Sequence, residues 1–215
     1  MFTGLIQQIG KLERIIHIQN GLQLAVLTQA PELELIEGQS IAVNGVCLTI
    51  TSVRRKNLFI CDVLQETLAT TTFIRKKPGC SLNLELPLQL GAEMGGHIVT
   101  GHVDGIGAVL SREKVGRDYI FRFTCPEELI KGIILKGSIA IDGVSLTVTE
   151  LKKDSFAIHI IPYTLSHTLF CELKRGDEVN IEIDIIGKYV YQYMNAYKPG
   201  GKLTITDLHK AGFTE

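Results

Sequence analysis

Two short segments of the chain combine a tight turn with small polar side chains. One reads NGVCLT from residue 44 and the other reads DGVSLT from residue 142. Asn-Gly and Asp-Gly are typical of turns, and residues i and i+2 of the strand that follows share a face. Cys47 and Thr49 therefore point the same way, as do Ser145 and Thr147. Such pairs could bind a planar heterocycle by hydrogen bonds, whereas two interior-facing small residues after a turn are the structural alternative.

A segment rich in glycine and histidine, GGHIVTGHVDG at 95–105, is the second candidate. Its adjacent glycines allow close approach of a ligand or another chain. Cys47 could form a nucleophilic pair with His97 or His102, and a purely structural histidine is the alternative in each case. We predict no metal site, because this histidine spacing is not that of a helical zinc motif. The sequence also lacks a phosphate-binding glycine loop and a nucleophile elbow.

These candidate segments recur because the chain contains two copies of one unit. SIAVNGVCLTIT at 40–51 and SIAIDGVSLTVT at 138–149 match at eight of twelve positions, at an offset of 98. QETLATTTF returns as PYTLSHTLF, and KPGCSLNLEL returns as KRGDEVNIEI, both at an offset of 97. One residue has therefore slipped, most simply in the loop at 54–57 against 152–155. A period this long indicates duplicated domains and not a solenoid.

Each copy is predicted to be a β-domain. Segments such as SFAIHII and EVNIEID are short, rich in isoleucine and valine, and bounded by turns, which favours a small antiparallel barrel. We predict an all-β fold: two tandem homologous six-stranded antiparallel Greek-key β-barrels followed by a C-terminal α-helix. The expected boundaries are 1–96 and 97–187 for the barrels, 188–198 for the helix and 199–215 for a polar tail. Short helical pieces are expected at PELELIEG and PEELIKG.

The predicted C-terminal helix has an apolar face. Val190, Tyr193, Met194 and Tyr197 follow one another at helical spacing. A helix of this length is marginal alone in water. Its apolar face therefore packs either on its own barrel or on another subunit, and the periodicity leaves both alternatives open.

Composition excludes several classes of protein. Lys and Arg number 22 against 23 Asp and Glu, for a net charge of −1, so we expect neither nucleic acid nor an anionic membrane surface as a partner. The N-terminus does not read as a secretory signal, and no apolar run is long enough for a membrane span. Five cysteines without a CxxC pair indicate free thiols, and we expect a cytoplasmic protein.

Taken in order, these motifs resemble the riboflavin synthase family over about residues 1–195. The resemblance rests on MFTGLIQQIG, NGVCLT, the D-x-x-x-ET-L segment, GGHIVTGHVDG, and KGSIAIDGVSLTVTE with HIIPYT. It implies a dismutation of two 6,7-dimethyl-8-ribityllumazine molecules, in which one transfers a four-carbon unit to the other. The products are riboflavin and 5-amino-6-(ribitylamino)uracil, and no metal or organic cofactor is used. The resemblance also implies a homotrimer formed through the C-terminal helix, with active sites between subunits.

The resemblance assigns residues to two substrate pockets. The first would hold Cys47, Leu48, Thr49, Asp62, Val63, Leu64, Gln65, Glu66 and Thr67. A neighbouring chain would complete it with Gly101, His102, Val103 and Lys136. The second would hold Gly4, Leu5, Ile6, Ser145, Leu146, Thr147, His159, Ile160, Ile161, Pro162, Tyr163 and Thr164. The two domains would thus exchange their Thr-Gly segments, so that Thr3-Gly4 serves the second pocket and Thr100-Gly101 the first.

We expect positioning of the two rings to supply most of the rate enhancement. His102, Cys47 and Ser145 would aid proton transfer or delivery of a nucleophile. Tyr163 stands where a charged residue is common in the family, so a backbone role is expected there. Two alternatives stay open: a non-catalytic antenna protein that binds a lumazine or flavin, and a structural protein that self-associates. Intact motifs in the second copy favour the enzyme.

Overall fold

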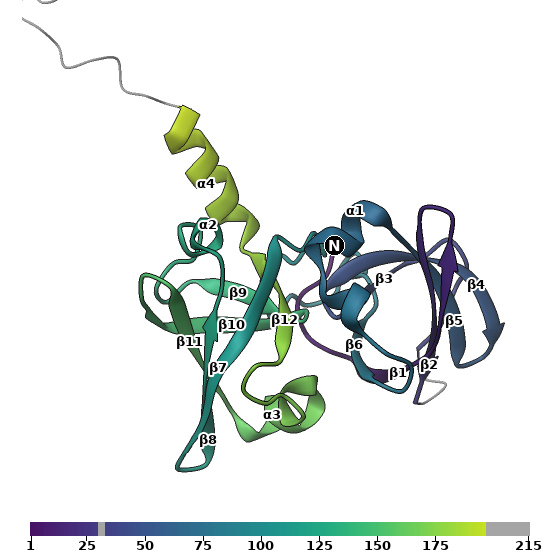
Figure 1. Cartoon of the computed structure of the whole chain (residues 1–215), viewed down its shortest axis with the longest axis horizontal. Coiled ribbons are helices and arrows are strands. Elements are labelled where there is room, and N and C mark those ends of the chain that lie inside the picture. Colours follow the sequence, from purple (N-terminus) through teal and green to yellow (C-terminus); the bar gives the residue numbers. More distant parts are fainter. Residues whose placement is uncertain (30–32, 197–215) are drawn as a thin grey trace, which may run out of the picture.

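The computed structural model describes residues 1–29 and 33–196 of the 215-residue chain. The chain forms two closed antiparallel β-barrels followed by a helix (Figure 1), as predicted. The first barrel contains β1 (Gln8–Ile18), β2 (Gly21–Thr28), β3 (Ser40–Val43), β4 (Val46–Arg55), β5 (Leu58–Leu64) and β6 (Ser81–Glu85). The second contains β7 (Gly105–Val115), β8 (Asp118–Thr124), β9 (Ser138–Ile141), β10 (Val144–Leu151), β11 (Ser155–Ile160) and β12 (Glu178–Ile183).

Both barrels have the same topology. The first closes in the order β1-β2-β5-β4-β3-β6, and the second closes in the corresponding order β7-β8-β11-β10-β9-β12. Bulges recur at equivalent places, between Leu12 and Arg14 in β1 and between Val109 and Ser111 in β7. Strand β4 has a further bulge between Val53 and Arg55 that β10 lacks. This bulge accommodates the one-residue slip between the copies, since it lies beside the loop where the sequence places that slip.

Alternating burial explains why these segments form barrels. In β4 the side chains of Val46, Leu48 and Ile50 are buried in the first core. Cys47 and Thr49 lie between them and face outward, because successive residues of a strand point to opposite faces. The alternative of two interior-facing small residues is therefore wrong. The second core differs by an aromatic cluster, in which the rings of Phe121 and Phe170 meet edge to face at 5.2 Å.

In each barrel a helix pair that the sequence did not reveal connects the fifth strand to the sixth. These are α1 (Gln65–Thr70) with the 3₁₀ helix η1 (Thr72–Arg75), and α3 (Pro162–His167) with η2 (Leu169–Cys171). The predicted piece PEELIKG forms α2 (Glu127–Ile130). The predicted piece PELELIEG is wrong in its described part, because residues 33–38 form a bend and a turn. Its residues 31 and 32 lie outside the described residues.

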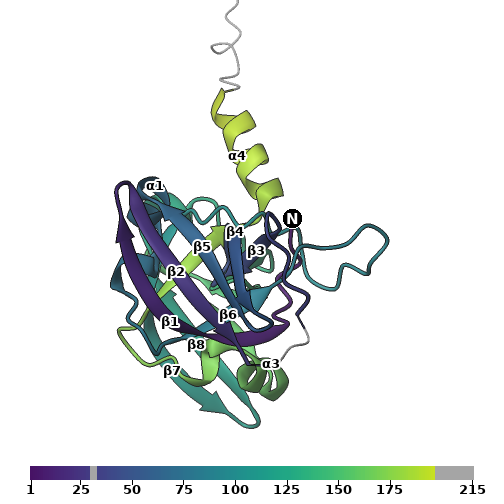
Figure 2. The same cartoon turned by 90° about the vertical axis from the view of Figure 1, so that its right-hand side faces the viewer.

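The C-terminal helix α4 (Ile185–Ala196) begins at Ile185 and projects away from both barrels (Figures 1 and 2). Its side chains Val190, Tyr193 and Met194 are 57%, 65% and 67% exposed. The alternative that this face docks onto its own barrel is therefore wrong for these three residues. Tyr197 and the predicted tail 199–215 lie outside the described residues. No helix in the described part of the chain is long and apolar enough to cross a membrane.

The two barrels meet at a seam formed by their Asx-Gly turns. A Cβ on Gly45 would lie 2.6 Å from the backbone nitrogen of Gly143, so only glycine allows this approach. Asn83 of β6 donates its side-chain N–H to the carbonyl of Asp142, and Asn180 of β12 donates to that of Asn44, both at 2.9 Å. The reciprocal contacts relate the two copies by an approximate twofold axis.

Candidate functional site

Two Thr-Gly segments cross the seam and join each barrel to the other. The backbone carbonyl of Gly4 accepts a hydrogen bond from the N–H of Ser145 at 2.8 Å. The carbonyl of Gly101 accepts from the N–H of Cys47 at 2.9 Å. Ile6 packs against the second core and Val103 against the first. The predicted exchange of the two segments is thus present in the structure.

A buried carboxylate of the home barrel holds each segment in place. Glu85 accepts hydrogen bonds from the backbone N–H groups of Thr3 and Gly4 at 2.7 and 3.1 Å. Glu182 accepts from those of Thr100 and Gly101 at 2.7 and 2.9 Å. Burial raises the pKa of Glu85, and the hydrogen bonds from Thr3 and Gly4 oppose that rise. Each carboxylate fixes the segment whose carbonyl then reaches the neighbouring barrel.

Glycine is required at the centre of both segments. Gly4 and Gly101 have φ of 78° and 82°, a region that side-chain-bearing residues rarely adopt. A Cβ on Gly4 would lie 2.5 Å from the Cβ of Ser145, and one on Gly101 would lie 2.5 Å from the Cβ of Cys47. Each Thr-Gly motif therefore packs against a turn motif of the other copy, Thr3-Gly4 against DGVSLT and Thr100-Gly101 against NGVCLT.

A pocket of about 290 Å³ opens beside Cys47. It brings together six of the residues assigned to the first site: Cys47, Glu66, Thr67, Gly101, His102 and Val103. Val46, Thr70 and Thr71 complete the lining. The expectation that a neighbouring chain supplies residues 101–103 is wrong, because the same chain places them against its own first barrel.

The remaining residues assigned to the first site lie outside this pocket lining. Leu48 and Val63 face the barrel core. Asp62 accepts a hydrogen bond from the side chain of Gln23 at 2.9 Å. Lys136 is exposed in the turn before β9 of the second barrel, with φ of 66°. Thr49, Leu64 and Gln65 are exposed on the surface of the first barrel.

The second site is centred on Ser145 and includes a histidine absent from the predicted set. The Ser145 hydroxyl lies 2.7 Å from Nδ1 of His97. Gly96 also packs on Ser145, because a Cβ there would lie 3.1 Å from Oγ. Of the two histidines considered as partners of Cys47, His97 contacts Ser145 instead, and His102 shares the pocket of Cys47.

The environment of His97 favours its neutral form. Burial lowers the pKa of His97, while the charges of Asp184 and Glu182 act in the opposite direction. Its Nε2 is buried and has no hydrogen-bond partner among the described residues. The GGH motif indicated a candidate histidine at this position. Both Cys47 and Ser145 follow an Asx-Gly turn, so the sequence did not reveal which of the two His97 contacts.

Comparison with known proteins accounts for both barrels. The model of the lumazine binding domain matches residues 3–87 and 100–184. The chain is 39% identical to riboflavin synthase of Actinobacillus pleuropneumoniae over 217 residues, covering 99% of this chain and 100% of that protein. It is 42% identical to riboflavin synthase of Brucella abortus (strain 2308) over 194 residues, covering 88% and 96%. The chain belongs to the riboflavin synthase family.

Solved structures of LumP are similar in fold to this chain. LumP in complex with riboflavin has a TM-score of 0.78 at 26% identity, covering 85% of this chain and 99% of that chain. LumP in complex with 6,7-dimethyl-8-(1'-D-ribityl) lumazine has a TM-score of 0.77 at 24% identity, with coverage of 85% and 98%. The second likeness concerns the fold alone.

The two sites of this riboflavin synthase family member differ on their helical walls. Glu66 and Thr70 of α1 line the first pocket, and their counterparts at an offset of 97 are Tyr163 and His167 of α3. The rings of Tyr163 and His167 stack at 4.0 Å. Of the other residues assigned to the second site, Ile160 is buried, Leu146, Pro162 and Thr164 are half-buried, and Leu5, Thr147, His159 and Ile161 are exposed. No cluster of potential metal ligands occurs in the described part of the chain.

Proposed function

We propose that the protein catalyses the transfer of a four-carbon unit between two molecules of 6,7-dimethyl-8-ribityllumazine. One molecule becomes riboflavin and the other leaves as 5-amino-6-(ribitylamino)uracil. The atoms of two substrates equal those of the two products, so the overall reaction needs no added oxidant or reductant. The observation that carries the proposal is the pair of repeat-related sites, each built from an outward-facing strand and a Thr-Gly segment of the other copy.

The duplicated sites suit a reaction between two identical molecules. Each barrel offers one small polar side chain, Cys47 or Ser145, next to a fixed backbone carbonyl. The two molecules have unequal roles, and the sites are correspondingly unequal at these positions. Holding the reacting carbons close together contributes roughly 7–11 kcal/mol to such reactions.

We assign proton-transfer roles from the contacts of each site. His102 shares the first pocket with Cys47. In the second site the neutral imidazole of His97 accepts the proton of the Ser145 hydroxyl, whose oxygen lies 2.7 Å away. This pairing gives Ser145 a base that Cys47 does not share, and general acid–base groups of this kind contribute typically 10²–10⁴-fold.

Assembly as a homotrimer is part of the proposal. The exposed apolar side chains of α4, which include Tyr189, Val190 and Met194, form a surface that a second copy would cover. Each active site then lies between the first barrel of one subunit and the second barrel of its neighbour. We place the reaction in the cytoplasm, since all five cysteines are free thiols.

Turnover of the lumazine tests the function directly. Purified protein incubated with 6,7-dimethyl-8-ribityllumazine should develop riboflavin fluorescence. His102→Ala, Cys47→Ala and Ser145→Ala should each lower the rate by about 10²-fold or more, if each aids proton transfer or nucleophile delivery. Cys125→Ala and Ser111→Ala serve as matched controls, because these residues lie outside both sites.

The same assay separates the enzyme from a binding protein. LumP structures contain lumazine and flavin ligands, so ligand binding without catalysis is the competing function. Binding of the lumazine without formation of riboflavin would establish that function instead. Near-full rates in all three site variants would overturn the side-chain roles and leave the pocket assignment intact.

A further inference from the structure

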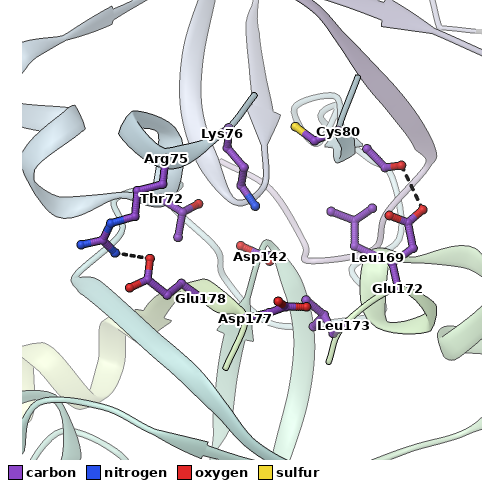
Figure 3. A pocket seen from close by; sticks show the side chains of 11 residues that line it. Thr72, Arg75, Lys76, Cys80, Asp142, Leu169, Glu172, Leu173, Asp177 and Glu178 are labelled. Carbon is purple, nitrogen blue, oxygen red and sulfur yellow. Dashed lines mark hydrogen bonds and ion pairs between the residues drawn. The ribbon is translucent and has the colours of Figure 1, made fainter. Parts of the chain in front are cut away.

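A second pocket of about 290 Å³ lies on the seam between the barrels (Figure 3). Its walls are η1 and the start of β6 on one side, and η2 and the start of β12 on the other. None of its lining residues belongs to the pocket beside Cys47. The seam pocket is therefore a separate feature of the molecule.

A buried carboxylate at this pocket has an unused acceptor. Asp142 is 1% exposed, and its Oδ1 accepts a hydrogen bond from the N–H of Asn180 at 2.9 Å. Its Oδ2 is buried and has no partner among the described residues. A buried acceptor without a donor is costly. The unpartnered oxygen is therefore open to a donor that the chain itself does not supply.

The opposite side of the pocket offers an unused donor. The ammonium group of Lys76 points toward Asp142 in Figure 3 and forms neither an ion pair nor a hydrogen bond within the described part of the chain. Burial raises the pKa of Asp142 and the charge of Lys76 opposes that rise, so the two groups are near enough to interact. They face each other without direct contact.

Other charged groups of the seam pocket already have partners. Arg75 forms an ion pair with Glu178. Glu172 accepts a hydrogen bond from the Ser81 hydroxyl at 2.9 Å, and Asp177 accepts one from a backbone N–H at 2.7 Å. An occupant must therefore satisfy one donor and one acceptor and cannot rely on the remaining charges.

The twofold axis generates no second copy of this charged pair. The counterparts of Lys76 and Asp142 in the other copy are Leu173 and Asn44, at offsets of 97 and 98. Leu173 lines the same pocket, and Asn44 is fully buried. Neither counterpart carries a charge, so the seam offers one such site per chain.

We infer that the seam pocket binds a small neutral ring that carries an N–H group beside a carbonyl, as in a cyclic ureide of the pyrimidinedione type. The N–H donates to Oδ2 of Asp142, and the carbonyl accepts from Nζ of Lys76. A free anion would meet the carboxylates of Glu172, Asp177 and Glu178, and a free cation would meet Lys76. A volume of about 290 Å³ suits one ring, because it is at the lower end for ligand pockets.

The identity of the natural ligand rests on the proposed function. That reaction releases 5-amino-6-(ribitylamino)uracil, a single ring with this donor–acceptor edge. The seam pocket adjoins the first site through the junction of α1 and η1, where Thr71 lines one pocket and Thr72 the other. Thr72 also donates its N–H to the side chain of Asn180 at 2.8 Å. A product bound at the seam would therefore be next to the first substrate site.

Uracil serves as the probe, and N,N′-dimethyluracil, which lacks both N–H donors, serves as the control ligand. Full-length protein is titrated at pH 8 and binding is followed by saturation-transfer NMR. We expect uracil to bind, and its affinity to fall about 10- to 100-fold in Asp142→Asn and in Lys76→Leu, since each removes a hydrogen bond to a charged group. These two variants copy residues that the chain already carries at Asn44 and Leu173. The neighbouring exposed residue supplies the matched control, Lys77→Leu.

Three results would overturn the inference: no uracil binding by the wild-type protein, unchanged affinity in Asp142→Asn and Lys76→Leu, or equal binding of N,N′-dimethyluracil. Thermal melting of each variant shows whether it is folded. Riboflavin formation is measured separately. Absence of turnover with variant-sensitive uracil binding would overturn the proposed function and leave the seam site standing.

Discussion

Asn44 and Asp142 show how one atom changes the behaviour of a repeated position. Both residues have positive φ, 46° and 44°. Both accept a backbone N–H from the last strand of their barrel, at 2.7 Å from Asn83 and 2.9 Å from Asn180. They differ in the second side-chain atom, which is an amide nitrogen in Asn44 and a carboxylate oxygen in Asp142. The difference matters because both residues are buried.

Burial raises the pKa of Asp142 from 3.8 to about 6, with Lys76 and the N–H of Asn180 opposing the rise. The native state therefore binds this proton more tightly than the unfolded chain does. The stability that protonated Asp142 provides is present below about pH 4 and is lost as the pH rises to about 6. A pKa difference of about 2 between the folded and unfolded states corresponds to about 3 kcal/mol in the free energy of unfolding.

Asp142→Asn should therefore stabilise the protein at pH 8, by an amount that approaches this figure, and should have little effect near pH 4. Urea unfolding at both pH values measures the difference from wild type. Asp154→Asn, which removes an exposed carboxylate in the turn between β10 and β11, should show no such trend. A stability gain that is equal at the two pH values would contradict the assignment.

At the scale of elements, the Thr-Gly segments connect the fold to the site. In the present backbone, Gly101→Ala would place a Cβ 2.5 Å from the Cβ of Cys47 and would put alanine at an unfavourable φ of 82°. Overpacking of this kind costs typically about 1–3 kcal/mol, and the backbone strain adds about 1–2 kcal/mol. The segment must shift, so we expect both lower stability and slower riboflavin formation.

Gly79→Ala separates the two effects. Gly79 has φ of 94° but nothing within 4 Å of its added Cβ, so this variant has the strain without the clash. It should lose stability by about 1–2 kcal/mol and keep its turnover. Urea unfolding and the fluorescence assay measure both quantities. Equal losses in Gly101→Ala and Gly79→Ala would show that the approach to Cys47 is unimportant.

Sequence patterns predicted these elements unevenly. Alternation and turn residues indicated the barrels, and the repeat indicated that there are two. Helices α1 and α3 were missed because each has six residues, too few for a helical period to stand out. The exchange of Thr-Gly segments followed from the family resemblance. Its occurrence within one chain did not, because a neighbouring copy would present the same sequence.

Long-range pairings in the site were the least predictable. His97 and Ser145 are 48 positions apart, and the motif around Cys47 offers the same turn and strand. The choice between them depends on how the linker between the barrels runs. Likewise, the seam pocket combines residues of η1 with Asp142 of the other barrel, so no local pattern reveals it.

At the scale of the whole molecule, α4 presents apolar side chains that neither barrel covers. Its side chains Tyr189, Val190 and Met194 are exposed, while Lys188 ties the start of the helix to the second barrel through an ion pair with Asp104 at 2.7 Å. The helix is thus held at its base and presents an apolar surface beyond it. A subunit interface in the proposed homotrimer would bury that surface.

Val190→Glu tests this arrangement without touching either barrel. A carboxylate introduced into a buried interface must be desolvated without a partner, which is strongly unfavourable. We therefore expect the trimer to dissociate in analytical ultracentrifugation, and riboflavin formation to fall with it, because the proposed active sites lie between subunits. Thermal melting should still show folded barrels. Gln192→Glu introduces the same charge on the same helix outside the predicted apolar face, and it should leave assembly and turnover nearly unchanged. A Val190→Glu protein that stays trimeric would remove α4 from the interface, and a fully active monomer would mean that one chain brings both substrates together by itself.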